Sequence, residues 1–168
     1  IGGGKYFATQ VDHVAGEQAI GMWDFNECAA STTADRSGYL NNGILTNGAS
    51  WSATTPLGTG CSISFDGTDD YIDMGDINAL DGLTAMTASA WVKTTATGEK
   101  HILDKSSCLG GTNNGVFELF MAYTTNGKAS ALIYPSGGAP NFYAIEGATS
   151  INDGNWHLVT GVRSVSAD

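Results

Sequence analysis

Turn-forming dipeptides divide most of this chain into short segments. Asn-Gly or Asp-Gly pairs occur at 42–43, 47–48, 66–67, 81–82, 114–115, 126–127 and 153–154. Asparagine, aspartate and glycine adopt the positive φ angles that tight hairpins require. The spacing shows no alternation of strands with helix-length segments, so parallel βαβ units are excluded. From Gly21 onward, the pattern predicts strands joined by tight turns.

Alternation of apolar and polar residues gives the predicted strands, at 22–26, 43–45, 62–66, 71–74, 84–94, 101–105, 116–123, 129–134, 143–146 and 156–163. In 84–93, Met86, Ala88, Ala90 and Val92 share one face. The strand at 116–123 is apolar on both faces, which indicates cover on both sides. We expect an all-β, two-sheet antiparallel jelly-roll sandwich over 21–168. A lead segment at 1–20 is predicted to carry a short helix over 5–18.

The charge balance excludes several functions. The 168 residues, a length typical of one domain, carry 17 acidic against 7 basic side chains, a net charge of −10. Nucleic acid and anionic lipid would therefore be repelled. The longest apolar runs are far shorter than the roughly 20 residues that span a bilayer. The acidic excess instead indicates divalent cations as partners.

The cysteine count is odd, at three. We expect a disulfide between Cys28 and Cys61, which flank predicted strands, with Cys108 unpaired. The alternative is three unpaired thiols that behave as small apolar residues. Because there is no Cys-x-x-Cys and the three histidines are dispersed, we expect no zinc site.

Four segments, in order, resemble the signatures of the laminin-G-like (pentraxin/concanavalin A-like) jelly-roll family. They are WDFNE at 23–27 with ADRSGYLNNG at 34–43 and Trp51, then SFDGTDDYI at 64–72, ASAWVK at 88–93 and DGNWHLV at 153–159. Arg36, Tyr39 and Leu40 depart from the small residues usual in the second stretch. Family members continue with further strands after the last signature. The resemblance therefore implies missing carboxy-terminal strands and an exposed strand edge that could pair with another chain.

Calcium is the cofactor that we expect, because Ca²⁺ prefers carboxylate, amide and carbonyl oxygens. Related jelly rolls often hold a structural calcium ion on such loops. The candidate ligands are Asp24, Asp35, Asn41, Asn42, Asp69 and Asp70, the last two within an acidic run from Asp66 to Asp81. The alternative is that these residues close turns by bonding their own backbone.

Exposed aromatic side chains near turns could stack on sugar rings. The candidates are Tyr39, Tyr134, Phe142 and Tyr143. The alternative is that each merely covers the rim of a sheet.

We do not expect an enzyme. No Glu-x-Asp-x-Glu and no Gly-x-Ser-x-Gly occurs, and Glu118 has no carboxylate two residues away. The resemblance implies a non-catalytic extracellular or cell-surface domain that binds a glycan or a surface protein. The alternative is the head of a pilin-like surface filament that assembles through the lead helix. The third possible function is that of a glycosidase.

Overall fold

The computed structural model of the chain describes residues 5–7, 19–81, 83, 85–105, 117–133 and 143–164. The elements in these ranges are β1 (Lys5–Phe7), β2 (Thr32–Thr33), β3 (Gly43–Thr46), β4 (Ser50–Ser52), β5 (Ser62–Ser64), β6 (Tyr71–Asp73), a 3₁₀ turn η1 (Asn78–Leu80), β7 (Met86–Lys93), β8 (Lys100–Lys105), β9 (Phe117–Met121), β10 (Lys128–Ile133), β11 (Tyr143–Ser150) and β12 (Trp156–Arg163). No helix among these residues is long and apolar enough to cross a membrane.

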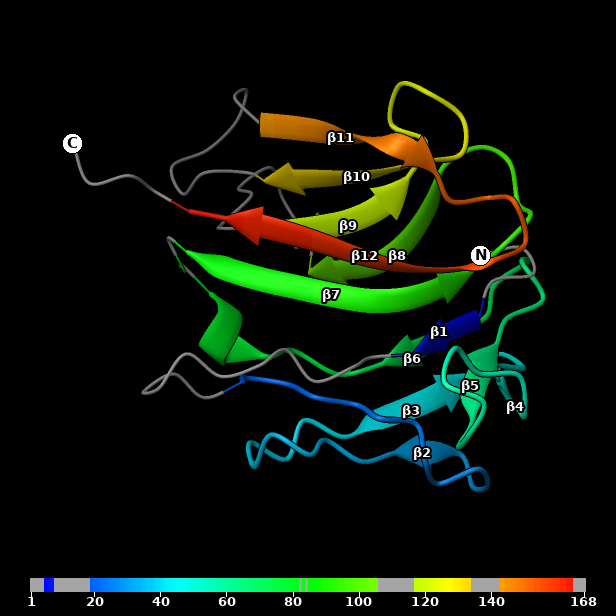
Figure 1. Ribbon diagram of the computed structural model, residues 1–168. Coiled ribbons are helices and arrows are strands. Elements are labelled where there is room, and N and C mark those ends of the chain that lie inside the picture. The colour runs from blue at the N-terminus through cyan, green and yellow to red at the C-terminus, as the bar shows by residue number, and fades with distance from the viewer. Residues whose placement is uncertain are drawn as a thin grey trace.

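The strands form two large antiparallel sheets and one small one (Figure 1). The first large sheet has the order β12-β7-β1-β5-β4, and the second has the order β11-β10-β9-β8. The small sheet, β2-β3-β6, was not predicted. The all-β antiparallel prediction is confirmed, whereas the jelly-roll connectivity stays a prediction.

The core lies between the two large sheets, because each places alternate apolar residues toward the other. Ala88 and Val92 of β7 share it with Phe117, Leu119 and Met121 of β9, as the alternation predicts. Phe120 points to the other face of β9 but is only 2% exposed. The prediction that this strand is covered on both faces is therefore confirmed at Phe120, while His101 and Asp104 of the neighbouring strand β8 keep that face partly exposed.

The predicted helix over 5–18 is wrong at its start. Residues 5–7 form β1, which pairs antiparallel with both β5 and β7. The hydrogen bonds that this segment makes with the two neighbouring strands outweigh its weak preference for a helix. The rest of that prediction, residues 8–18, lies outside the described residues.

The predicted strand at 22–26 is also wrong. Phe25 has a φ of 52°, in the left-handed region, which interrupts an extended strand. Tertiary contacts fix this segment instead: Phe25 is buried, and the Trp23 Nε1–H donates to the Asn41 carbonyl oxygen at 2.8 Å. The short strands β2 and β4 were not predicted, because two or three residues carry too little alternation to read.

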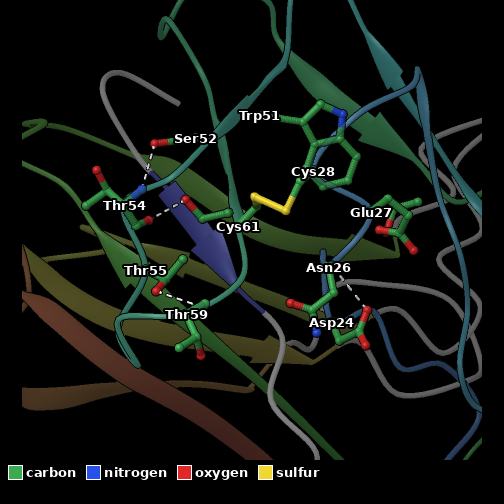
Figure 2. Close-up of a disulfide and its surroundings, with 12 residues drawn as sticks. Asp24, Asn26, Glu27, Cys28, Trp51, Ser52, Thr54, Thr55, Thr59 and Cys61 are labelled. Carbon is green, nitrogen blue, oxygen red and sulfur yellow. Dashed lines mark hydrogen bonds between the residues drawn. A yellow bond between two sulfur atoms is a disulfide. The ribbon is translucent and has the colours of Figure 1, made fainter.

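The Cys28–Cys61 disulfide is confirmed. It joins the irregular segment before β2 to the residue just before β5, with Trp51 of β4 beside it (Figure 2). The Trp51 Nε1–H donates to the Ala30 carbonyl oxygen at 2.7 Å. The segment at 21–31, which has no regular secondary structure, is thus fastened covalently and by hydrogen bonds to the first large sheet.

Candidate functional site

Three aspartates converge in the loop between β5 and β6. Each of Asp66, Asp69 and Asp70 offers one carboxylate oxygen within 4.8 Å of the other two. The chain turns sharply here because Asp66 Oδ1 accepts the Thr68 N–H at 2.7 Å and Gly67 takes a φ of 91°. This turn carries Asp69 and Asp70 back beside Asp66. We call these three residues the aspartate cluster.

Asp70 forms the buried floor of the aspartate cluster. Its residue surface is 6% exposed, and its Oδ2 accepts the Asp66 N–H at 2.8 Å. Its other oxygen, Oδ1, is buried and has no hydrogen-bond partner within the described part of the chain. A buried carboxylate oxygen without a donor costs free energy, so it calls for a ligand.

The turn between β3 and β4 packs against this floor. Gly48 has a φ of 114°, and a Cβ placed on it would lie 3.0 Å from Asp70 Oδ1. The neighbouring Asn47 donates from Nδ2 to the Asp69 carbonyl oxygen at 3.1 Å. Two loops that are distant in sequence therefore enclose the inner side of the aspartate cluster. Asp66 and Asp69 remain exposed on the outer side.

No lysine or arginine of the described ranges forms an ion pair with the aspartate cluster. Arg36 pairs with Asp24 and Glu27, and Lys105 pairs with Asp76 and Asp81. Three carboxylates without a cation repel one another. Oxygens bound to one Ca²⁺ at 2.3–2.6 Å lie at most about 5 Å apart, so the cluster fits this ion.

Asp35, another predicted ligand, has its carboxylate filled by hydrogen bonds. It accepts the backbone N–H groups of Met22, Ser37 and Asn41 and the Ser37 hydroxyl, at 2.7–3.0 Å. Burial alone would raise its pKa, but the bonds from Ser37, Met22 and Asn41 outweigh burial and lower the pKa. A carboxylate with four bonds has about four lone-pair sites in use, so Asp35 organises its loop.

The other predicted ligands lie around Asp35. The Asn42 Oδ1 accepts the Asp35 N–H at 3.0 Å, and the Asn41 Nδ2 donates to the Ile20 carbonyl oxygen at 2.9 Å. Asp24 lies 3.5 Å from the Arg36 Nε. The predicted set is thus divided, and only Asp69 and Asp70 join the aspartate cluster. Asp66 came from the wider acidic run, and its Asp-Gly turn was the signal that could have singled it out.

Two of the predicted aromatic residues are exposed. Tyr39, in the loop between β2 and β3, is 49% exposed, and Tyr143, at the start of β11, is 68% exposed. Tyr134 and Phe142 lie outside the described residues. Both visible candidates are accessible to a ligand, as stacking on a sugar requires.

The structure also assembles a group of ionisable residues that the sequence did not reveal. Asp104 of β8 lies directly opposite Glu118 of β9, and His101 lies opposite Phe120. Sequence spacing alone could not show this, because the carboxylates come from different strands and meet only through the register.

A laminin-G family model, described as the concanavalin A-like lectin/glucanases superfamily, matches residues 66–167. The chain belongs to this superfamily. The match includes the aspartate cluster and all strands from β6 onward. No curated protein and no solved structure matches the chain.

Membership of the concanavalin A-like superfamily fits a domain that binds a carbohydrate or a partner. The superfamily description covers both lectins and glucanases, so membership does not decide between binding and hydrolysis.

Proposed function

We propose that this chain is a non-catalytic extracellular recognition domain that binds a glycan and is stabilised by one calcium ion in the aspartate cluster. The observation that carries the calcium part is Asp70: its buried Oδ1 has no donor among the described residues, and its carboxylate lies beside those of Asp66 and Asp69. The superfamily and the exposed rings of Tyr39 and Tyr143 support the glycan part.

In this proposal, Asp70 holds the ion from below, and Asp66 and Asp69 hold it from the solvent side. Calcium supplies a positive charge that removes the repulsion among the three carboxylates. Because the cluster abuts the β3–β4 turn, the ion also holds that turn to the β5–β6 loop.

Thermal unfolding with and without calcium tests the ion. At a hundred times its dissociation constant, calcium should add about 2.7 kcal/mol. For a chain of this size, that raises the Tm by roughly 5–10 °C. Asp70→Asn should abolish this shift. In the absence of calcium, it should leave the Tm equal or higher, because it relieves repulsion in the cluster.

Asp73→Asn is the matched control, since it removes one acidic charge from the neighbouring strand β6 and leaves the cluster intact. It should keep the full calcium response. A wild-type Tm that does not respond to excess calcium overturns the calcium part of the proposal.

A glycan array tests recognition, with and without calcium. We expect at least one glycan to bind without being hydrolysed, and Tyr39→Ala or Tyr143→Ala to weaken binding while the calcium-dependent Tm shift persists. An array without any binder contradicts the glycan part, and turnover of a bound glycan contradicts the non-catalytic part.

A further inference from the structure

A second group of ionisable side chains lies on the face of the β11-β10-β9-β8 sheet that is turned away from the core. Residues directly opposite in an antiparallel pair share a face, so the His101–Phe120 and Asp104–Glu118 pairs lie on one side. The core-facing residues of β9, such as Leu119, lie on the other. With Glu99 before β8, these residues form what we call the histidine–carboxylate cluster: Glu99, His101, Asp104 and Glu118.

His101 is the centre of this cluster. Its Nε2 lies 3.5 Å from Glu99 Oε1. Its Nδ1 lies 3.7 Å from Asp104 Oδ2 and 3.9 Å from Glu118 Oε2. The imidazole stacks on Phe120, with ring centroids 5.7 Å apart, so a buried ring supports it from below.

The cluster has more negative than positive charge. Three carboxylates surround one histidine, and no lysine or arginine in the described part of the chain lies within ion-pair distance of them. Lys105, also on β8, pairs instead with Asp76 and Asp81. An anionic ligand would be repelled from this face.

Glu118 is the most constrained of the three acids. Its side chain is only 14% exposed, and no hydrogen bond is donated to its carboxylate from the described residues. Burial raises the pKa of Glu118, and the nearby charges of Asp104 and Glu99 raise it further against the opposing effect of His101. An enclosed acid without a donor, in a group of ionisable side chains, is typical of a binding site.

Ser130 gives a second, independent sign of an unsatisfied site. It lies on β10, opposite Phe120 and on the same face as Glu118. The residue is 2% exposed, and its Oγ has no hydrogen-bond partner in the ranges that the structure describes. On neighbouring strands, the Glu118 carboxylate thus lies diagonally across from the Ser130 hydroxyl, and neither has a hydrogen-bond partner among the described residues.

The chemistry of the cluster selects one kind of ligand group. A primary ammonium carries three N–H donors and a positive charge, so it meets both the missing donors and the missing charge. A neutral hydroxyl donates one hydrogen bond but leaves the charge unbalanced. A bare metal ion fits less well, because within the described residues only the aspartate cluster brings three such ligand atoms within 4.8 Å of one another.

We propose that the histidine–carboxylate cluster binds the ammonium group of an unacetylated amino sugar, with Glu118 and Asp104 as its anionic partners. This inference rests on the proposed glycan-binding function and specifies the sugar class. The ammonium lies between β8 and β9, beside the stacked pair His101 and Phe120. The site is separate from the aspartate cluster, which lies in the loop between β5 and β6.

Calorimetric titration near neutral pH tests this site with three probes: a glucosamine trisaccharide, its fully N-acetylated counterpart and putrescine. The glucosamine trisaccharide should bind, and the acetylated one, which has no ammonium, should bind at least tenfold more weakly. Putrescine, an amine without a sugar ring, distinguishes a site for amino sugars from a site for any amine. If it binds more weakly than the glucosamine trisaccharide, the sugar ring contributes. If it binds equally well, the amino-sugar assignment is overturned and only an amine site remains.

Glu118→Gln keeps the shape of the side chain and removes its charge. It should weaken binding of the glucosamine trisaccharide by about tenfold to a hundredfold, the range for one charged hydrogen bond. The folded protein disfavours a charge at this position, so the variant should have an equal or higher Tm. A Tm of this kind shows that the weaker binding does not come from unfolding. Asp73→Asn, the control for overall charge, should bind as wild type does.

Two further results would overturn the proposal: no binding of either amine to the wild-type chain, or equal binding by wild type and Glu118→Gln. Failure of the wider function has a different signature. A glycan array without binders, together with putrescine binding that depends on Glu118, would refute glycan recognition and leave an amine site.

Discussion

At the scale of single residues, carboxylates in this chain have two distinct roles. Some, such as Asp35, accept several hydrogen bonds and hold loops in place. Others, such as Asp70 and Glu118, are largely enclosed and receive one hydrogen bond or none from the described residues. The first kind contributes stability, whereas the second lowers it unless a ligand is bound. The two candidate binding sites are assigned on this difference.

Glu146 belongs to the first kind and gives a test of pH dependence. Its Oε2 accepts the Thr124 hydroxyl and the backbone N–H groups of Thr124 and Thr125, which lowers its pKa to about 2 from 4.5. A carboxylate whose pKa is lower in the folded than in the unfolded state stabilises the fold at any pH above its unfolded-state pKa. This stabilisation is lost as the pH falls toward the folded-state pKa. Glu146→Gln should therefore lower the Tm at pH 7.

That deficit should shrink between about pH 5 and pH 2, where wild-type Glu146 becomes protonated. Thermal melts across this range measure it. Equal deficits at every pH would show that Glu146 does not act through its charge.

At the scale of elements, β12 and the facing sheet approach closely at Gly161. A Cβ at this position would lie 2.9 Å from the Phe117 Cζ, 3.3 Å from Leu119 and 3.4 Å from Ala131. Gly161→Ala should therefore force the buried Phe117 to shift, at a cost of about 1–3 kcal/mol. Urea denaturation measures this loss directly.

Gly147→Ala is the matched control within β11. Among the described residues, its Cβ would meet only the Ala129 carbonyl oxygen, at an ordinary contact distance of 3.4 Å. This variant should change stability little. If both alanine variants lost the same stability, strand propensity and not the spacing of the sheets would explain the effect.

At the scale of the whole molecule, the Cys28–Cys61 disulfide closes a loop between residues separated by 33 positions. The chain-entropy relation assigns such a loop about 4 kcal/mol. The double variant Cys28→Ala/Cys61→Ala should lose most of this free energy of unfolding. Alkylation of the unfolded, unreduced wild type should label one cysteine, Cys108, of the three.

Labelling of all three thiols would contradict the disulfide. A double variant as stable as wild type would show that the hydrogen bonds of this region, such as that from Trp51 to Ala30, suffice without it.

The sequence by itself determined the all-β class, most strand positions and the family, whereas it left the Cys28–Cys61 disulfide open against three unpaired thiols. These depend on local properties: positive φ at Asn-Gly and Asp-Gly, alternation along strands such as β7, and short ordered motifs. It failed at 22–26, where Phe25 takes a left-handed angle and its ring is buried in the core.

Only the tertiary structure decided which polar residues are satisfied. Asp35 and Asp70 look alike in the sequence as aspartates of turn-rich loops, yet one accepts four hydrogen bonds and the other keeps a buried oxygen with no donor among the described residues. Asp104 and Glu118 meet only through the register of β8 and β9. The physical reason is that turn and strand preferences act over a few neighbouring residues, whereas desolvation and charge depend on every element packed nearby.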